Sequence, residues 1–552
     1  MSDRLPTTIN GLLARARELW PDRPYLQVRV AQTVHSLTFR EVAEQAEIAA
    51  RVLLKKGVRP GDRVALLADN RPSWVTSYFA ILLAGAVVVP VDSLMSPPEI
   101  VNVLKMAKVR LIVTTSRFLD ALAAVEAFRE LSAEQLLLDR GLRAGDEPRA
   151  SITFHAPQPS DVAVIIFTSG TTGFSKGVVL THSNLCADLQ AIMDAGVLHE
   201  GDSFLLLLPL HHTFSSTVVM LGSLALGARA LFATSYKSRD IVDDVRIGQV
   251  SMLVGVPQVF EKLMIGMRRA VSDSPPARRL LFGAFYGLSA ALYRVGIPAG
   301  RALFMSLRGK AGMKTLRHMV SGGAALPPEI NRFFEYLGFE LLQGYGLTET
   351  SPVLSVNRPH RLRIGSVGPP LPGIELRIDS PDKDGVGEIC ARGPVVTQGY
   401  YEKADATAEV LHDGWLHTGD AGYLDKDGFL FITGRIKNLI VTGAGKNVYP
   451  EEIEAQLNLS PYILESLVVG RKDKRAAGEE LVAMIVPDKA YIEFEIAHGR
   501  QVAVEAEIRQ VVNAYNDTAP AYRRIRQWKI CDEEFQKTST RKIRRYLYSR
   551  EF

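Results

Sequence analysis

The sequence has few cysteines, and none stands where it would help to hold a metal ion. Only three occur in 552 residues, without C-x-x-C spacing or a histidine cluster nearby: Cys186, Cys390 and Cys531. Isolated cysteines are typical of reduced thiols in the cytosol, so the sequence argues against a zinc site. The first residues, M-S-D-R-L-P-T-T, also lack the apolar segment of a secretion signal. We therefore expect a cytoplasmic protein.

Long apolar runs and a strong charge imbalance are missing as well. Runs such as 81–91 and 203–210 are much shorter than the ~20 residues that span a bilayer. The formal net charge is only +5, and the basic residues gather at the C-terminal end, which argues against a nucleic-acid partner. With 47% hydrophobic residues, a chain of this length can bury more than one core, so we expect several domains.

Two common nucleotide signatures are absent, but another phosphate-binding pattern is present. No G-x-G-x-x-G lies between a predicted strand and a helix. Residues Phe167–Gly177 read F-T-S-G-T-T-G-F-S-K-G after the apolar run Val162–Ile166, and Lys176 stands three residues past Gly173, unlike the lysine of a Walker A loop. A hydroxyl- and glycine-rich turn that leaves a buried strand can wrap phosphate oxygens with backbone N–H groups, and Lys176 adds positive charge. The segment therefore predicts an ATP site.

Apolar strands that alternate with helices predict parallel βαβ units. A first run has strands at 64–68, 86–91 and 109–114, separated by helices at 72–84 and 97–107. A second run begins at Val162 and continues through strands at 204–208, 228–232, 250–254 and 316–320. Two wound α/β sheets are the expected architecture.

The pattern changes after residue 373. Short alternating segments between Gly373 and Thr433 predict a small antiparallel or barrel-like β subdomain. Beyond Arg435 we expect a small mobile α+β lid domain, with helices at 450–457 and 502–516 and strands at 464–469 and 481–486. The predicted division is a large domain at 1–436 and a C-terminal lid domain at 437–552.

Further motifs follow the phosphate loop in a fixed order: S-G-G-A-A at 321–325, G-Y-G-L-T-E-T at 344–350, W-L-H-T-G-D at 415–420, G-R at 434–435 and K-T-S-T-R-K-I-R-R at 537–545. Together they resemble the adenylate-forming superfamily of acyl-CoA synthetases, luciferases and peptide-synthetase adenylation domains. The resemblance runs from about Leu37 to Arg545 and is greatest to bacterial long-chain fatty acyl-CoA synthetases. Two positions depart from the family pattern: Ser175 replaces the usual proline of the loop, and Arg541 replaces the usual glycine before Lys542.

The resemblance implies an ATP site built from several segments. The nucleotide-binding residues it implies are Thr168, Ser169, Gly170, Thr171, Thr172, Gly173, Lys176, Gly322, Gly323, Ala324, Gly344, Tyr345, Asp420 and Arg435. Among them, Tyr345 would pack on adenine, and Asp420 would accept hydrogen bonds from the ribose hydroxyls. Glu349, with Thr168, would ligate Mg²⁺.

The same resemblance assigns the catalytic groups and the lid. Catalysis would involve Thr348 at the α-phosphate, Glu349, the lysine Lys542 of the final motif and His212 beside the substrate carboxylate. For the adjacent pair His211 and His212, we disfavour a metal site because neighbouring residues of a strand point to opposite faces. The lid would turn at the hinge residue Lys437 and bring Gly443 and Gly445 to the coenzyme A side.

The expected activity is that of an ATP-dependent acid–thiol ligase. It would adenylate a long-chain fatty acid, release pyrophosphate and transfer the acyl group to coenzyme A, with ATP and Mg²⁺ as cofactors. An acyl carrier protein ligase and a medium-chain or aryl-CoA ligase stay open, as does a non-catalytic nucleotide-binding lipid sensor. Residues 280–307, rich in Leu, Phe, Tyr, Ala and Gly with interspersed arginines, could border an acyl tunnel, contact the inner membrane face or form core helices. An acyl carrier protein and a second copy in a homodimer also stay open as partners.

Overall fold

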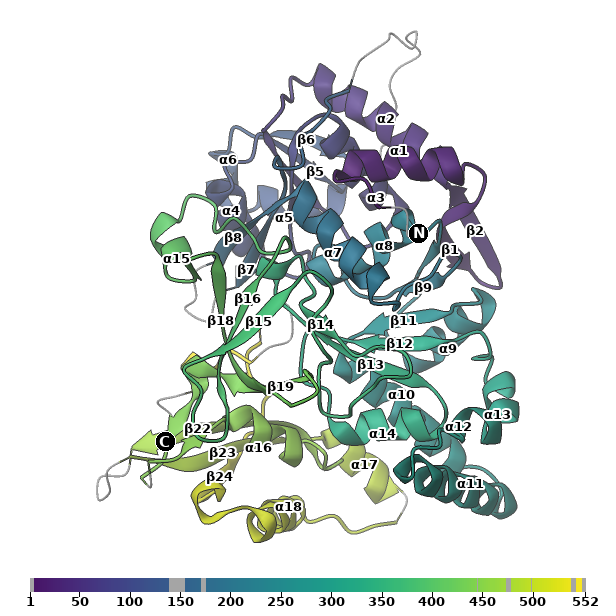
Figure 1. Ribbon diagram of the computed structural model, residues 1–552, viewed down its shortest axis with the longest axis vertical. Helices are drawn as coiled ribbons and strands as arrows, with labels where there is room; N and C mark the ends of the chain where they lie inside the picture. The colour runs from purple at the N-terminus through teal and green to yellow at the C-terminus, as the bar shows by residue number, and fades with distance from the viewer. Residues whose placement is uncertain are drawn as a thin grey trace. The chain divides into compact units, whose positions relative to one another are not determined.

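The computed structural model describes residues 4–138, 154–169, 175–443, 445–472, 478–497, 499–537 and 543–548 (Figure 1). The chain divides into two compact units, each described below by itself. The first unit comprises Met1–Thr168, Ser175–Leu376 and Ala391–Leu416, and the second comprises Ser169–Phe174, Arg377–Cys390 and His417–Phe552. Within the described ranges, no helix is both long and apolar enough to cross a membrane.

A six-stranded sheet forms from the first predicted run. Its order is β6 (Glu134–Leu137), β5 (Leu111–Thr114), β3 (Arg63–Leu67), β4 (Val87–Pro90), β7 (Val162–Ser169) and β8 (Ser175–Thr181). The strands β6, β5, β3 and β4 are parallel, as expected for βαβ units. One expectation is corrected here: the strand at Val162 does not open the second sheet but pairs with β4, through Val88 and Val164.

An eight-stranded sheet holds the second run. Its order is β14 (Ser355–Val356), β13 (Glu340–Tyr345), β12 (His318–Ser321), β11 (Met252–Gly255), β9 (Ser203–Leu206), β10 (Arg229–Phe232), β1 (Pro24–Val30) and β2 (Thr33–Thr38). The strands from β13 to β1 are parallel, and the edge strands β14 and β2 are antiparallel to their neighbours. Two wound sheets are therefore confirmed, with the N-terminal strands β1 and β2 added to the second.

Helices cover the faces of both sheets, so the central strands are buried on two sides. In β9, Phe204 and Leu206 belong to one apolar core, whereas Leu205 between them belongs to another. This explains why the strand reads as a continuous apolar run rather than an alternating one. The helices of this unit are α1 (Ile9–Leu19), α2 (Phe39–Lys55), α3 (Pro72–Leu83), α4 (Pro97–Met106), α5 (Ser116–Ala123), α6 (Glu126–Arg129), α7 (His182–Asp194), the π-helix η2 (Phe214–Leu221), α8 (Gly222–Ala225), α9 (Ser238–Ile247), α10 (Pro257–Ser272), α11 (Pro276–Arg294), α12 (Gly300–Leu303), α13 (Met305–Lys310), α14 (Pro328–Tyr336) and α15 (Ala404–Ala408).

Local sequence signals set several helix starts. Thr181 caps α7: its hydroxyl oxygen accepts a hydrogen bond from the N–H of Asn184 at 3.1 Å, and the Asn184 side chain accepts from the N–H of Thr181 in return. Ser96 and Glu99 make the equivalent capping box at α4. Pro72 and Pro97 occupy first-turn positions, where a missing N–H costs nothing.

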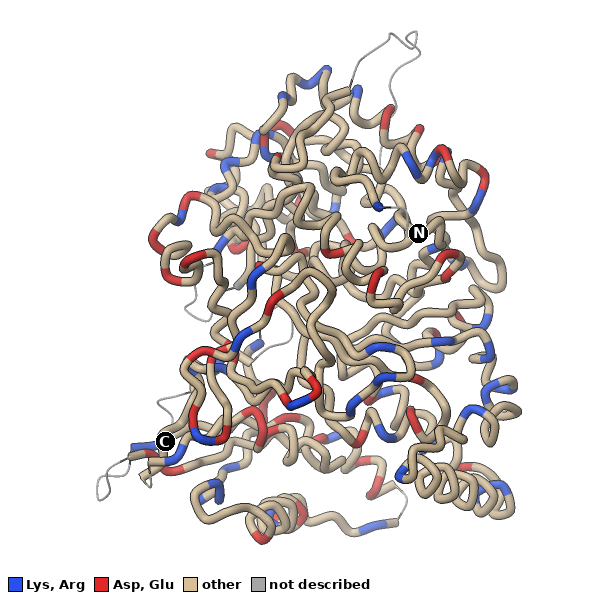
Figure 2. The backbone as a smooth tube through the Cα atoms, viewed as in Figure 1, with Lys and Arg blue, Asp and Glu red and all other residues tan. Residues whose placement is uncertain are grey.

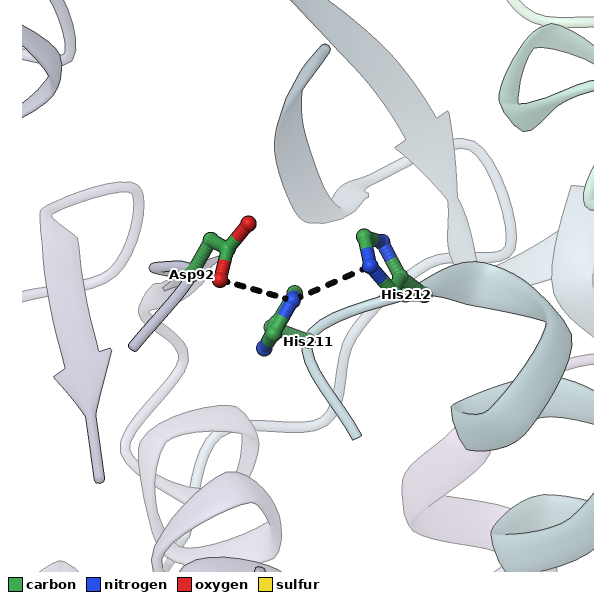
Figure 3. Close-up of side chains that lie close together, drawn as sticks. All are labelled: Asp92, His211 and His212. Carbon is green, nitrogen blue, oxygen red and sulfur yellow. Dashed lines mark hydrogen bonds and ion pairs between the residues drawn. The ribbon is translucent and has the colours of Figure 1, made fainter. Parts of the chain in front are cut away.

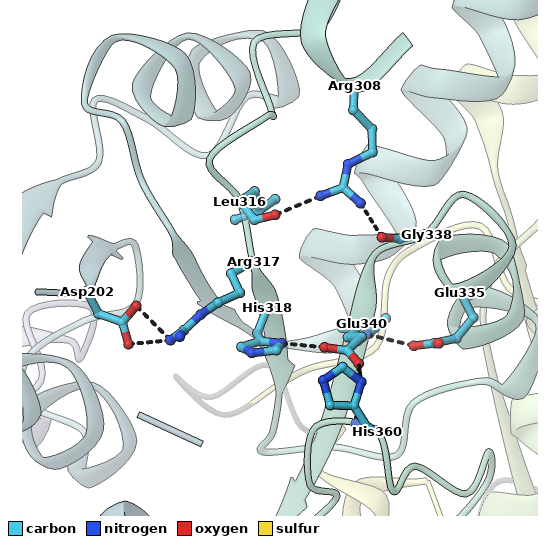
Figure 4. Close-up of polar contacts among 10 residues, drawn as sticks. Asp202, Arg308, Leu316, Arg317, His318, Glu335, Gly338, Glu340 and His360 are labelled. Carbon is cyan, nitrogen blue, oxygen red and sulfur yellow. Dashed lines mark hydrogen bonds and ion pairs between the residues drawn. The ribbon is translucent and has the colours of Figure 1, made fainter. Parts of the chain in front are cut away.

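A polar network joins the amino ends of β9, β12 and β13 (Figure 4). Asp202, just before β9, accepts hydrogen bonds from Arg317 at 2.7 and 2.8 Å. Ring nitrogens of His318 and His360 lie 2.8 and 3.0 Å from the carboxylate of Glu340. The network ties the strand starts together, which leaves the opposite, carboxyl ends of the same strands for a ligand.

Short antiparallel strands form a five-stranded sheet between residues 375 and 435, where a small β subdomain was expected. It contains β15 (Glu375–Asp379), β16 (Gly387–Arg392), β18 (Trp415–Leu424) and β17 (Leu411–His412) in that order, with β19 (Leu430–Arg435) also paired to β18.

The C-terminal residues of the second unit have an α+β arrangement of their own. Strands β22 (Ile463–Lys472) and β23 (Glu479–Pro487) are antiparallel, and β24 (Gln527–Ile530) pairs in parallel with β23. The α16 (Pro450–Leu457) and α18 (Val504–Thr518) helices pack on this sheet around Ile453, Val468 and Ile508. The remaining elements are β20 (Ile440–Val441), β21 (Asn447–Val448), α17 (Lys489–Ala497) and the short turns η4 (Ile436–Asn438), η5 (Ala521–Arg523) and η6 (Arg545–Leu547). The boundary at 436 and 437 stays a prediction.

Candidate active site

The predicted phosphate loop connects two strands of the six-stranded sheet. Strand β7 ends at Ser169 and β8 begins at Ser175, so the segment leaves a buried strand as the sequence indicated. At the base of the loop, the Thr168 hydroxyl donates to the backbone carbonyl of Lys176 at 3.5 Å. Four predicted phosphate-binding residues lie outside the described residues, and of Ser169 only the backbone is described: Gly170, Thr171, Thr172 and Gly173. Their roles stay predictions.

Tyr400 joins the phosphate loop to the predicted magnesium ligand. The ammonium nitrogen of Lys176 lies 4.9 Å from the centre of the Tyr400 ring, a cation–π distance. The hydroxyl of Tyr400 donates to Oε1 of Glu349 at 2.9 Å. The backbone carbonyl of Glu349 also accepts from the N–H of Thr397 at 2.8 Å. Sequence reasoning missed Tyr400; the only local signal was an aromatic pair directly after Gly399.

The two glycine loops leave neighbouring parallel strands. Ser321, the last residue of β12, pairs with Gln343 of β13, so Gly322 and Gly344 directly follow paired residues at the same edge of the sheet. This is where open α/β sheets bind ligands. Gly323 has a φ of +80°, and a Cβ on Gly322 would lie 2.9 Å from the Phe214 ring. Both positions therefore favour glycine; the neighbouring Ala324 is exposed.

A short 3₁₀ turn, η3 (Thr348–Thr350), presents the predicted catalytic pair at the end of the second loop. The Thr350 hydroxyl oxygen accepts from the N–H of Leu347 at 2.9 Å and fixes the start of the turn. A Cβ at Gly346 would lie 1.8 Å from the carbonyl oxygen of Pro352, so only glycine fits there. Tyr345, Thr348 and Glu349 are each half-buried. They are therefore held firmly but stay accessible to a ligand.

The histidine pair lies in a turn after β9, and the expectation about its geometry is wrong. Because the strand ends at Leu206, the rings of His211 and His212 do not point to opposite faces: their Nε2 atoms are 3.1 Å apart (Figure 3). Nε2 of His211 also lies 3.2 Å from Oδ1 of Asp92, a residue the sequence did not single out.

Polar contacts hold this arrangement together. Nε2 of His211 lies between the Asp92 carboxylate and Nε2 of His212. Burial, together with the neighbouring His212, lowers the pKa of His211 well below its usual value, so the ring is neutral. Asp92 and His211 thus lie directly behind the ring of His212, which is half-buried.

The predicted ribose-binding pair lies in the second unit. Asp420 of β18 and Arg435 of β19 stand opposite each other in the antiparallel ladder. Nε of Arg435 lies 2.7 Å from Oδ1 of Asp420, and its Nη1 donates to the carbonyl of Thr418 at 3.3 Å. The Asp420 carboxylate is buried and held by a positive charge, so it is preorganised to accept hydroxyl donors.

Other residues of the second unit were predicted to act in the lid. Lys437 lies exposed in η4, two residues after Arg435, and Gly443 and Gly445 are exposed, with a φ of +65° at Gly445. Lys542 lies outside the described residues, as does Arg541. The chain on both sides of this lysine is anchored to the C-terminal sheet.

On one side of the lysine, Lys537 forms ion pairs of 2.8 and 2.6 Å with Glu465 and Glu534. On the other, Arg545 pairs with Glu454 and donates to the carbonyl of Val468. The basic C-terminal stretch is therefore not simply a solvated tail.

Cys390 also has neighbours that its sequence spacing did not reveal. Nδ1 of His417 lies 2.8 Å from Glu388 and 3.4 Å from the Cys390 sulfur. Burial, with the charge of Glu388, raises the pKa of the Cys390 thiol to about 11. The thiol therefore keeps its proton in this group of polar contacts.

Comparisons with known proteins give a consistent result. The family model described as AMP-binding enzyme matches residues 13–401, and that of the AMP-binding enzyme C-terminal domain matches residues 452–542. The long-chain-fatty-acid–CoA ligase FadD15 of Mycobacterium bovis is 34% identical over 475 residues, covering 82% of this chain and 78% of its own length. A feruloyl-CoA synthase of Amycolatopsis is 31% identical, covering 82% of this chain and 84% of its own.

The fold has a match among solved structures. The O-succinylbenzoate coenzyme A synthetase MenE of Bacillus subtilis, in complex with ATP and magnesium ion, aligns with a TM-score of 0.76 at 24% identity. The alignment covers 97% of this chain and 98% of that one. At this identity the likeness concerns the fold, a large α/β N-terminal domain followed by a C-terminal domain with an antiparallel sheet.

Proposed function

This chain belongs to the AMP-binding enzyme family, and from that premise we propose that it is an ATP-dependent acyl-CoA ligase. It activates a carboxylic acid as an acyl adenylate, releases pyrophosphate and passes the acyl group to the thiol of coenzyme A. The observation that carries the proposal is the contact of Tyr400 with Lys176 and Glu349. Residues far apart in sequence converge there as an ATP phosphate site requires.

The first half-reaction brings two anions together. At about 4 Å and an effective dielectric near 20, a carboxylate and one phosphate charge repel by about 4 kcal/mol. Lys176 supplies positive charge at the phosphate loop, and the half-buried Thr348 hydroxyl can donate to the α-phosphate. His212, whose ring lies against His211, is half-buried and can contact the substrate carboxylate.

Magnesium fits the oxygen donors at this site. Only one oxygen of Glu349 is bound by Tyr400, and among the described residues its other oxygen has no hydrogen-bond donor. A half-buried carboxylate with an oxygen to spare, together with the Thr168 hydroxyl, is the type of donor set that Mg²⁺ prefers. When bound, the ion would neutralise charge on the phosphate oxygens.

The second unit completes the cycle in this proposal. The Asp420 carboxylate, oriented by Arg435, holds the ribose hydroxyls. Lys542 comes from the C-terminal domain, which turns at Lys437, and it stabilises the negative charge that builds up at the α-phosphate. A further turn then removes the lysine and brings Gly443 and Gly445 to the path of coenzyme A. We take 437–552 as the mobile domain.

For the acid, we propose a long-chain fatty acid. This choice is supported by the similarity to FadD15 and by the motif segments, whereas the feruloyl-CoA synthase shows that relatives of similar identity act on other acids. Pyrophosphate release measured across fatty acids of increasing length and across aryl acids, in one buffer, ranks the candidates directly. If only aryl acids cause pyrophosphate release, the substrate is an aryl acid and not a fatty acid. An absence of release with every acid would favour a non-catalytic lipid sensor.

The two half-reactions test the mechanism. We expect Lys542→Ala to lower the adenylation rate about 10²- to 10⁴-fold while thioester formation from supplied acyl adenylate is retained. Equal losses in both steps would contradict a lysine that acts only in the first. Offering free coenzyme A and acyl carrier protein in parallel identifies the acceptor. A product only with the carrier protein would make the chain an acyl carrier protein ligase.

A further inference from the structure

Helix α11 (Pro276–Arg294) is attached to the first unit by only one of its faces. The aromatic side chains of Phe282, Phe285 and Tyr286 pack against the core that lies between this helix and the eight-stranded sheet. Ser289 is the only buried residue of the helix, and its hydroxyl donates to the carbonyl of Tyr336 at 2.7 Å. The inward face therefore consists of rings and one buried hydroxyl, which fix the helix firmly in place.

The outward face of α11 is aliphatic, although it faces solvent. Exposed apolar residues recur at intervals of three and four, which places them on one stripe of the helix: Ala277, Leu280, Leu281, Ala284, Gly287, Leu288 and Ala291. Leu280 is 78% exposed and Leu281 55%. A contiguous exposed apolar stripe of this kind indicates a surface that a partner covers. Exposed apolar residues continue beyond the helix end at Val295, Ile297 and Met305.

Positive charge, without any negative charge, surrounds this stripe. Residues 274–328 contain eight lysines and arginines but no aspartate or glutamate. In Figure 2, α11, α12 and α13 accordingly carry blue segments and no red one. Six of the basic residues are exposed: Arg278, Arg279, Arg294, Arg301, Lys310 and Lys314. Within the described ranges, Arg278, Arg279 and Arg294 form no salt bridge.

The charge pattern decides between two kinds of partner. A second copy that met this face about a two-fold axis would bring the same arginines together, and like charges would repel across the interface. An anionic lipid surface offers the opposite charge beside an apolar interior. We propose that α11 and the segment that follows it form a docking surface for an anionic lipid bilayer, with the leucines entering the headgroup boundary and the arginines contacting lipid phosphates.

This surface goes beyond the proposed ligase reaction, because lipid binding through α11 requires neither ATP nor an acid. Each basic residue near an anionic membrane strengthens binding by about fivefold. Three leucines that enter the apolar boundary contribute at least about 100-fold together. The charge contribution and the apolar contribution to lipid binding can therefore be removed separately, and each loss of affinity can be measured.

Vesicle flotation tests the proposal without nucleotide or substrate. The full-length protein is mixed with vesicles of pure phosphatidylcholine, or with vesicles in which about a third of the lipid is phosphatidylglycerol. We expect it to float only with the anionic vesicles and to be released by high salt. The variant Leu280→Gln, Leu281→Gln, Leu288→Gln should bind about 100-fold more weakly. The variant Arg278→Gln, Arg279→Gln, Arg294→Gln should lose a similar factor.

Matched control variants keep the interpretation clear. One control variant replaces exposed apolar residues elsewhere by glutamine, at Leu19, Val30 and Leu94. A second replaces exposed basic residues elsewhere by glutamine, at Arg59 and Arg239. Both control variants should float like the parent protein. Circular dichroism melting confirms that each variant is folded, as expected for changes at exposed positions. Three results would overturn the proposal: no flotation with anionic vesicles, equal flotation of the leucine variant, or sedimentation as a dimer that the leucine variant dissociates. None of them would affect the proposed ligase activity.

Discussion

Tyr400→Phe isolates one hydrogen bond at the proposed phosphate site. The substitution deletes the hydroxyl that donates to Glu349 at 2.9 Å and leaves the ring beside Lys176, 4.9 Å from its ammonium nitrogen. Glu349 then loses the neutral donor that holds one of its oxygens in place. We expect a weaker site for magnesium-bound ATP, with the fold unchanged.

The size of the effect follows from the geometry. A hydrogen bond to a charged group contributes about 1.5–3 kcal/mol. Tyr400 and Glu349 are both half-buried, so water can replace part of the bond, and we take the lower end of the range. About 1.5 kcal/mol corresponds to roughly a tenfold loss in kcat/KM for ATP. The melting temperature should fall by no more than about 2 °C, because the ring keeps its packing.

The neighbouring tyrosine provides a matched control. Tyr401 stands beside the exposed carboxylate of Glu402, which pairs with Lys108 at 2.5 Å, so Tyr401→Phe deletes a tyrosine hydroxyl outside the site. Pyrophosphate release is measured against ATP and magnesium concentration for both variants. If Tyr400→Phe stays within twofold of the parent, or if both variants lose the same factor, the hydroxyl does not position Glu349 and the reasoning is refuted.

Three further predictions address other groups. Asp92→Ala should lower acid-dependent pyrophosphate release about tenfold and leave the KM for ATP unchanged, because His211 loses the carboxylate 3.2 Å from its Nε2 that holds the histidine pair in place. A loss confined to ATP binding would contradict this. Arg435→Lys should raise the KM for ATP about fivefold, measured by initial rates, because lysine cannot hold Asp420 and the Thr418 carbonyl at once. Burial raises the pKa of Glu335 from 4.5 to about 8, with a smaller raising effect of Glu340 and an opposing effect of the hydrogen bond from the Leu341 N–H (Figure 4). Between pH 4.5 and pH 8 the unfolded chain releases this proton whereas the folded chain keeps it, so the carboxyl lowers the stability of the fold as the pH rises. Glu335→Gln should therefore raise the melting temperature at pH 8 more than at pH 5, and an equal gain at both would show that the carboxyl is not buried in its neutral form.

The sequence predicted the parts of the fold that local patterns encode. Continuous apolar runs gave the parallel strands, and the helix at 450–457 matches α16 at both ends. The glycine motifs were expected directly after strands, and they lie at the ends of β12 and β13, although Ser321, Gly344 and Tyr345 still belong to the strands. Strand β2 was missed because most of it is exposed or half-buried, so its sequence has no clear apolar period.

Long-range pairing was beyond the reach of the sequence. Nothing near Val162 shows that this strand pairs with β4 rather than starting a second sheet. Tyr400 meets Glu349 only because the chain returns after 51 residues, and Asp92 meets His211 across a longer interval. The histidine rings were misplaced because strand geometry was applied to residues 211 and 212, which lie in a turn beyond the end of β9 at Leu206. The roles of Lys542 and of the loop residues 170–173 stay predictions.

The position of β1 in the eight-stranded sheet has a consequence for biosynthesis. Leu26 of β1 pairs with Ala230 of β10, about 200 residues later in the chain. At a translation rate of about 5–20 residues per second, the N-terminal strand leaves the ribosome roughly 10–40 s before its partner is made. During that interval the backbone of β1 can pair only with β2, as a hairpin whose other edge is open. The nascent chain therefore passes through a period in which an apolar strand edge is available to chaperones or to other chains. This period ends only when residues near 230 emerge from the ribosome.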